Sequence, residues 1–197
     1  ELKAGWFEKV RWLRQLHARR DTKAIDGAEE PTVGCLMHRD FLGDALDFWK
    51  GDLLRRLEQA DVVHDVHVLP MFTENVFNPD ERALYLDLTQ REPRQLLLPE
   101  VLVEHADRRS YFSMLPHDGD MFIDVDTGMR AKRSCEHVSP DEINALLDRA
   151  PGRIVMVYQH AWRHPDGAQA FSPMLKPVLA NVVILWSSQV SVLFFTR

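Results

Sequence analysis

Two carboxylates at the end of a short apolar strand are the first residues in this chain whose types and spacing suggest chemistry. Asp124 closes the apolar run Met121–Asp124, and Asp126 follows two positions later, just before Gly128. Alternate strand residues point the same way, so both carboxylates are expected to project into one space. Paired acids can hold Mg²⁺ or Mn²⁺, because hard cations prefer oxygen ligands, or they can accept hydrogen bonds from a base or an amine. The alternative is an Asx-type turn in which Asp126 bonds the backbone near Gly128.

A second group of charges lies on a predicted helix over residues 36–57. Its acids recur with helical spacing and form one stripe: Asp40, Asp44 and Asp47. Lys50 borders the stripe, and Gly51 continues it. A glycine costs a helix roughly 1 kcal/mol relative to alanine, so Gly51 suggests close approach by a backbone or a ligand. The stripe is predicted to face the same site as Asp124, or else to be a solvated edge on which Lys50 pairs with Asp47 or Asp44.

Polar residues also follow two other predicted strands. His160 and Arg163 come directly after the apolar run 154–158, and Glu74 lies in a polar loop after the run 62–72. In an open α/β sheet ligands bind at the carboxyl ends of the strands. His160 is therefore a candidate general base or ligand, although a lone histidine after a strand is often structural. Arg163 could receive a phosphate or carboxylate, and Glu74 is a candidate for substrate or metal binding.

These residues need a scaffold, and the apolar patterning predicts an α/β fold. Strands are expected at 62–72, Met121–Asp124, 154–158, 182–186 and 190–195, the last two as a hairpin. Asn78 and Ser139 are expected to begin helices, Ser139 with Glu142 as a capping box, whereas 83–88 and 95–103 fit helix or strand. Near-continuous apolar runs favour a mostly parallel central sheet with helices on both faces, and interior positions for Met121–Asp124 and 154–158.

Composition favours one cytoplasmic α/β domain. The chain has 197 residues and a net charge of −6, which disfavours nonspecific coating of nucleic acid. Its two cysteines form no CxxC motif, and no apolar stretch approaches the ~20 residues that span a bilayer, so neither export nor a membrane is expected. Residues 1–33 are predicted to be an amphipathic helix and linker, and 34–197 the α/β domain. Nothing in the sequence indicates an oligomeric state.

Several short motifs occur together in a recognisable order. They are GDxxDFxK with LLRxL at 43–57, LPMxT at 69–73, Tyr111-Phe112, FxDxDTG at 122–128 and VxVYQHxxR at 155–163. This pattern resembles an uncharacterised family of small bacterial and phage proteins, over about residues 38–195. The usual motif of that family is FLDPDTG, and Val125 stands here in place of its proline.

A more distant resemblance concerns the ribosomal-RNA adenine methyltransferases. They also have an early helix with an Asp…Lys pair, a middle strand ending in Asp-Pro-Pro-Tyr, and a Rossmann-like sheet closed by an antiparallel hairpin. The resemblance implies that Asp124 contacts the target amino group of a nucleic acid or nucleotide. It also implies that Asp44, Asp47 and Lys50 help to hold S-adenosylmethionine. This chain departs from the pattern at Val125-Asp126 and lacks a glycine-rich turn after the strand 62–72.

Three functions therefore remain open. One is a methyltransferase-like protein, or a relative that has lost cofactor binding. Another is a Mg²⁺- or Mn²⁺-dependent nuclease or phosphoesterase with Asp124 and Asp126 as metal ligands. The third is a non-catalytic binding protein, such as a phage or host-defence accessory.

Overall fold

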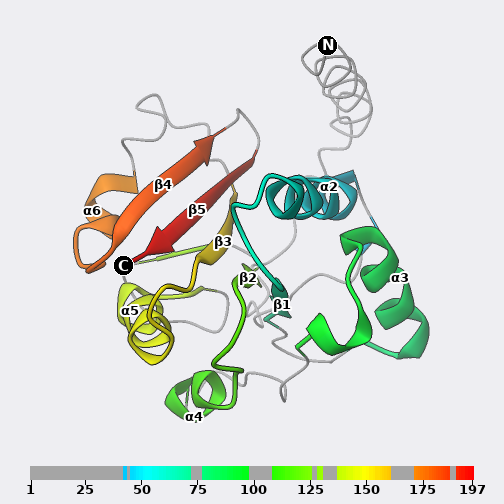
Figure 1. Cartoon of the computed structure of the whole chain (residues 1–197), viewed down its shortest axis with the longest axis horizontal. Coiled ribbons are helices and arrows are strands. Elements are labelled where there is room, and N and C mark those ends of the chain that lie inside the picture. The colour runs from blue at the N-terminus through cyan, green and yellow to red at the C-terminus, as the bar shows by residue number, and fades with distance from the viewer. Residues whose placement is uncertain are drawn as a thin grey trace, which may run out of the picture. The chain divides into compact units, whose positions relative to one another are not determined.

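A computed structural model describes most of the α/β part of the chain (Figure 1). The described residues are 42–43, 45–71, 77–97, 108–125, 128–130, 137–160, 171–186 and 190–197, without the side chains of Arg109, His160 and Trp186. All of them belong to the compact unit Gly34–Arg197. The predicted helix and linker at 1–33 lie outside them. Within the described part, no helix has the length and apolarity needed to cross a membrane.

A five-stranded sheet organises this unit, in the order β1-β2-β3-β5-β4. Its strands are β1 (His67–Pro70), β2 (Met121–Asp124), β3 (Val155–His160), β4 (Asn181–Trp186) and β5 (Val190–Thr196). The first three are mutually parallel, and β5 is antiparallel to both of its neighbours. The predicted α/β class and the interior positions of β2 and β3 are confirmed.

The last two strands form an antiparallel hairpin at one edge of the sheet, as predicted. Within the hairpin β5 pairs with β3, and β4 is the edge strand. Burial explains this order. Leu193 and Phe195 of β5 are fully buried, whereas Val183 and Leu185 of β4 are exposed. The more buried strand takes the position with a neighbour on each side.

The first strand is shorter than predicted, and the early helix is described from a later residue. Asp61 and Asp65 have positive φ angles of 59° and 45°, so the chain turns before β1 begins at His67. In the described part the early helix is α2 (Ala45–Gln59), which follows Gly43 at φ +86°.

The other helices are α3 (Pro79–Thr89), η2 (Pro93–Gln95), α4 (Arg108–Ser113), α5 (Pro140–Arg149) and α6 (Ser172–Leu175). The predicted starts at Asn78 and Ser139 are confirmed: Asn78 Oδ1 accepts two N–H groups of α3, and the Glu142 carboxylate accepts the N–H of Ser139 at 2.8 Å. Residues 83–88, open between helix and strand in the sequence, are part of α3.

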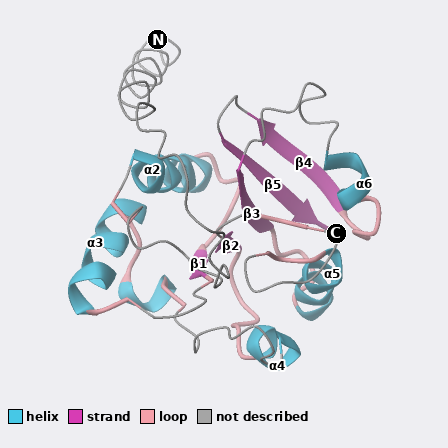
Figure 2. Cartoon of the chain, turned by 180° about the vertical axis from the view of Figure 1, so that it is seen from behind, coloured by secondary structure: helices cyan, strands magenta, loops and turns pink. Residues whose placement is uncertain are grey.

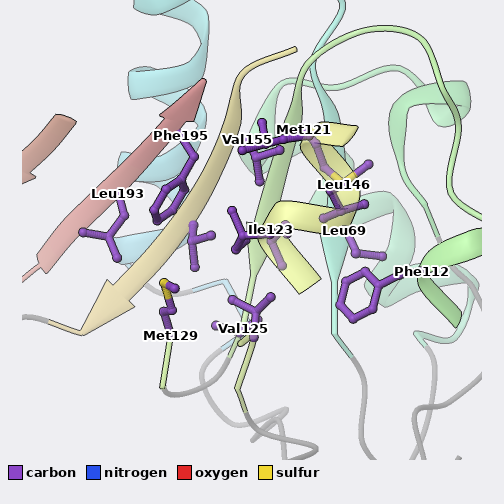
Figure 3. Close-up of a cluster of buried hydrophobic side chains, with 14 of the residues drawn as sticks. Leu69, Phe112, Met121, Ile123, Val125, Met129, Leu146, Val155, Leu193 and Phe195 are labelled. Atoms are coloured by element: carbon purple, nitrogen blue, oxygen red, sulfur yellow. The ribbon is translucent and has the colours of Figure 1, made fainter. Parts of the chain in front are cut away.

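The buried apolar side chains form two clusters, and alternate residues of each central strand belong to different ones. The first combines Ile123 of β2 with Leu146 of α5 and Phe112 of α4 (Figure 3). The second combines Phe122 of β2 with Leu54 of α2 and Tyr85 of α3. Because neighbouring strand residues point to opposite faces, the two clusters lie on opposite faces of the sheet. Both views show α3 and α5 on opposite sides of β1 and β2 (Figures 1 and 2).

Helix α2 meets α3 at Gly51, and the contact is between backbones. A Cβ atom on Gly51 would lie 2.0 Å from the carbonyl oxygen of Leu88 and 2.9 Å from the Cα of Thr89. Only a residue without a side chain allows this approach. The sequence expectation of close approach at Gly51 is confirmed, and the approaching group is the end of α3.

We therefore predict that Gly51→Ala destabilises the protein by about 3 kcal/mol or more, the upper end of the usual cost of overpacking, because a backbone carbonyl cannot rotate away. In a helix without this contact, the same change would stabilise by roughly 1 kcal/mol. Gly152→Ala is the control: nothing lies within 4 Å of its added Cβ, but its φ is +86°. Its cost should be only the ~1–2 kcal/mol of left-handed strain. Urea unfolding measures both variants. If Gly51→Ala and Gly152→Ala lower the free energy of unfolding equally, the α2–α3 contact is not tight.

Candidate functional site

Asp124 ends the middle parallel strand, and its carboxylate is buried against α2 and α3. Its side chain shares a face of the sheet with Phe122, and the residue is 2% exposed. Lys50 Nζ of α2 lies 2.9 Å from each carboxylate oxygen. The hydroxyl of Tyr85 on α3 donates to Oδ2 at 2.8 Å. One strand end and two helices therefore meet at this carboxylate.

Lys50 also binds a second carboxylate. Its Nζ donates to Asp47 Oδ1 at 2.9 Å, and Oδ2 of Asp47 accepts the backbone N–H of Gly43, also at 2.9 Å. The ammonium lies 4.5 Å from the ring centroid of Tyr158 on β3, a cation–π contact. We call Asp47, Lys50, Tyr85, Asp124 and Tyr158 the Lys50 cluster. All five are at most 6% exposed.

Local structure explains how these groups meet. Asp47 and Lys50 are three residues apart on α2, so their side chains share one face of the helix. The close contact at Gly51, the next residue after Lys50, brings α3 against α2. Tyr85 and Thr89 are the buried residues of α3, and Tyr85 packs against Phe77 with ring centroids 5.1 Å apart. The cluster therefore depends on the α2–α3 contact.

The electrostatics of the cluster favour a charged lysine. Burial alone would lower the pKa of Lys50, but the carboxylates of Asp124 and Asp47 more than compensate, and the pKa lies above its ordinary value. Burial raises the pKa of the Asp124 carboxyl; Lys50 opposes this, and the charge of Asp47 adds to it. Burial, and then the charges of Asp124 and Asp47, raise the pKa of Tyr85, so its hydroxyl remains a donor.

The structure brings together three of the residues singled out in the sequence: Asp47, Lys50 and Asp124. The side chain of His160 lies outside the described part, although its backbone pairs with Val190 at the end of β3. Four further candidates also lie outside it: Asp44, Glu74, Asp126 and Arg163. The expected pair of Lys50 and Asp47 is present, but it is buried, so a solvated edge is wrong for this part of the stripe.

Sequence reasoning missed the two tyrosines of the cluster. Tyr85 falls in the segment that was open between helix and strand, so no face could be assigned to it. Tyr158 lies on a strand that was correctly predicted, but as an apolar residue of a buried run. A signal was present at Tyr158: it precedes the polar residues Gln159 and His160 at the carboxyl end of that strand.

A metal site has little support among the described residues. Within them, no three His, Cys, Asp or Glu side chains are close enough together to hold a metal ion. Both oxygens of Asp124 lie within hydrogen-bonding distance of Lys50 Nζ. A cation at Asp124 would lie beside that ammonium, and the two positive charges would repel each other.

We predict that Lys50→Met destabilises the protein more than any other single change in the cluster. It leaves two buried carboxylates without their cation, which should cost about 3–5 kcal/mol. Asp47→Asn and Asp124→Asn each leave Lys50 with one carboxylate and should cost about 1.5–3 kcal/mol. Urea unfolding measures all three. Asp52→Asn on the same helix is the control, since Asp52 pairs with Arg55 and Arg56 at a partly exposed position outside the cluster and should contribute about 1 kcal/mol or less. The prediction is contradicted if Lys50→Met lowers the free energy of unfolding no more than Asp52→Asn does.

A second prediction concerns alkaline pH. Because the pKa of Tyr85 is raised in the folded state, the unfolded chain loses this proton first, above about pH 10. The free energy of unfolding should then fall by up to about 1.4 kcal/mol per pH unit for this group. Tyr85→Phe should be the less stable protein at pH 8, and the gap should narrow above pH 10.

Phe77→Leu is the control for this titration, because it perturbs the ring packed on Tyr85 and removes no ionisable group. Its stability curve should run parallel to that of the wild type from pH 8 to 11. A constant gap between Tyr85→Phe and wild type over this range would show that Tyr85 titrates normally.

Comparisons with protein-family models, with curated proteins and with solved structures find no match for this chain.

Proposed function

We propose that this chain is a methyltransferase-like α/β protein that acts on an amino group of a nucleic acid or nucleotide, with S-adenosylmethionine as the methyl donor. The observation that carries the proposal is the position of Asp124. It ends the middle one of three parallel strands and is held by a lysine and a tyrosine from two helices. The carboxyl ends of parallel strands are where open α/β sheets bind ligands.

The strand arrangement supports the proposed Rossmann-like fold. Three parallel strands are followed by an antiparallel hairpin that completes the sheet, as in the methyltransferases that the sequence resembles. Residues of α4 and α5 share one apolar cluster, and residues of α2 and α3 share the other. This distribution supports helices on both faces of the sheet.

The hydrogen bonds of Asp124 suit a role at a target amino group. A carboxylate offers about four lone-pair positions. Within the described residues Lys50 contacts both oxygens and Tyr85 contacts one, which leaves about one position for a further donor. In this proposal Lys50 and Tyr85 orient the carboxylate, which then accepts a hydrogen bond from the amino group and aligns its nitrogen with the methyl donor. Asp44 and Asp47 would help to hold the donor.

The remaining candidate residues are assigned roles in the proposed site, but the proposal does not depend on them. Asp126 and His160 would assist at the acceptor, and Glu74 and Arg163 would contact the rest of the substrate. A metal-dependent hydrolase built on Asp124 and Asp126 is a weaker proposal, because Lys50 already occupies the place of a cation at Asp124.

The test is a thermal-shift panel with S-adenosylmethionine, its demethylated product, Mg²⁺, Mn²⁺ and nucleotides. At about 100 times its dissociation constant, a ligand adds roughly 2.7 kcal/mol of stability. For a chain of this size that corresponds to a rise in Tm of roughly 5–11 °C. We expect this rise with S-adenosylmethionine and its product.

Two variants of α2 provide the matched comparison, each measured against its own Tm without ligand. Asp47→Asn should lose most of the response to S-adenosylmethionine, and Asp52→Asn should keep it. A response to Mg²⁺ or Mn²⁺ alone would favour the hydrolase. A wild-type protein that responds to no ligand in the panel would contradict the proposal and leave the non-catalytic binding protein.

A further inference from the structure

Gly128 and Gln159 come from two different sequence motifs, and the fold packs them against each other. Gly128 closes FxDxDTG after β2, and Gln159 belongs to VxVYQHxxR, which begins in β3. A Cβ atom on Gly128 would lie 2.4 Å from Oε1 of Gln159 and 2.7 Å from its Nε2. Gly128 also has a φ of +85°, a conformation that residues with side chains rarely adopt. The glycine is required twice here, for its conformation and for the space that the amide occupies.

The side chain of Gln159 holds the chain that returns from β2. Its Oε1 accepts the backbone N–H of Met129 at 2.7 Å, and both residues are fully buried. The segment is also held from a third element, because the carbonyl of Gly128 accepts the N–H of Val138 at 3.2 Å. Met129 lies in the same apolar cluster as Val125 (Figure 3).

Two anchors therefore act on opposite faces of the sheet. Asp124 is held by Lys50 and Tyr85 on the face of α2 and α3. Four and five residues later, Gly128 and Met129 are held by Gln159 on the face of α5. The described residues on either side of this turn, Asp124 and Met129, are therefore both fixed by side chains of other elements.

We propose that Gln159 is the positioning residue of this site: its amide fixes the return of the chain after β2 and so fixes how the end of β2 is presented to a ligand. The importance of this role for ligand binding rests on the proposed function. The anchoring of Met129 does not, and the two can be measured separately.

The key variant is Gln159→Leu, which keeps the approximate size of the side chain and removes the acceptor. Hydrogen exchange of the Met129 amide, followed by NMR, should become roughly tenfold faster or more, because a buried N–H loses its acceptor. The wild-type response to S-adenosylmethionine should weaken at least about tenfold in Kd, since a displaced loop no longer matches the ligand.

Two further variants separate positioning from general stability. Gln159→Glu at pH 5 keeps a neutral side chain of the same shape, since burial raises the pKa of a carboxyl, and should restore both Met129 protection and ligand affinity. Ser191→Ala removes only the hydroxyl that donates to the backbone carbonyl of Gln159 at 3.1 Å. It should lower Tm without changing Met129 protection or Kd.

Each outcome decides the inference. Unchanged Met129 exchange in Gln159→Leu would overturn the anchoring, whether or not any ligand binds. Fast exchange with an unchanged Kd would overturn the positioning role. If the wild type binds nothing in the panel, the proposed function fails, the positioning role fails with it, and the exchange result alone decides whether Gln159 anchors the loop.

Discussion

The burial of one ammonium group constrains much of the described structure. Lys50 is 6% exposed, and it has exchanged water for two carboxylates and the face of a tyrosine ring. Removing a charge from water costs several kcal/mol, so the ion remains buried only where its partners are in good geometry. That requirement ties α2 to the end of β2 and ties α3 to both through Tyr85. Gly51 allows the two helices to come close enough, one residue beyond the lysine.

The contact also joins residues that are far apart in sequence. Lys50 and Asp124 are separated by 74 positions, and Tyr85 lies between them in the chain. Hydrophobic burial alone would hold α2 and α3 against the sheet over a range of orientations. A lysine that must reach two carboxylates narrows that range, because a small rotation of α2 would leave a buried charge without its partner. In this way the cluster contributes to a specific arrangement as well as to stability.

The sequence predicted the features that depend on local patterns. It did not predict the features that depend on contacts between residues far apart in the chain. Apolar runs identified β2 and β3, and the residues around Asn78 and Ser139 identified two helix starts. The hairpin at the sheet edge was also predicted, but which of its strands lies beside β3 was not, because both strands are apolar and their periodicity is alike. At the site, spacing placed Asp47 beside Lys50, but only the fold shows that both are buried with Asp124. Tyr85 was missed because its segment had no clear period. The contact between Gly128 and Gln159 was missed because each belonged to a separate motif.

The charges of the Lys50 cluster do not sum to zero when both acids are ionised: two carboxylates surround one ammonium. Burial is the main cause of the raised pKa of Asp124, and the charge of Asp47 adds to it, whereas Lys50 opposes it. A cation or a hydrogen-bond donor that reached Asp124 would relieve the excess, whereas an anion would increase it. The excess negative charge makes the cluster costly to bury. It also means that the cluster favours cationic or hydrogen-bond-donating ligands over anions. An amino group or a positively charged methyl donor fits that preference better than a phosphate does. Under the proposed function, Asp124 would therefore contact the target amino group, and the phosphates of a nucleotide or nucleic acid substrate would be bound elsewhere.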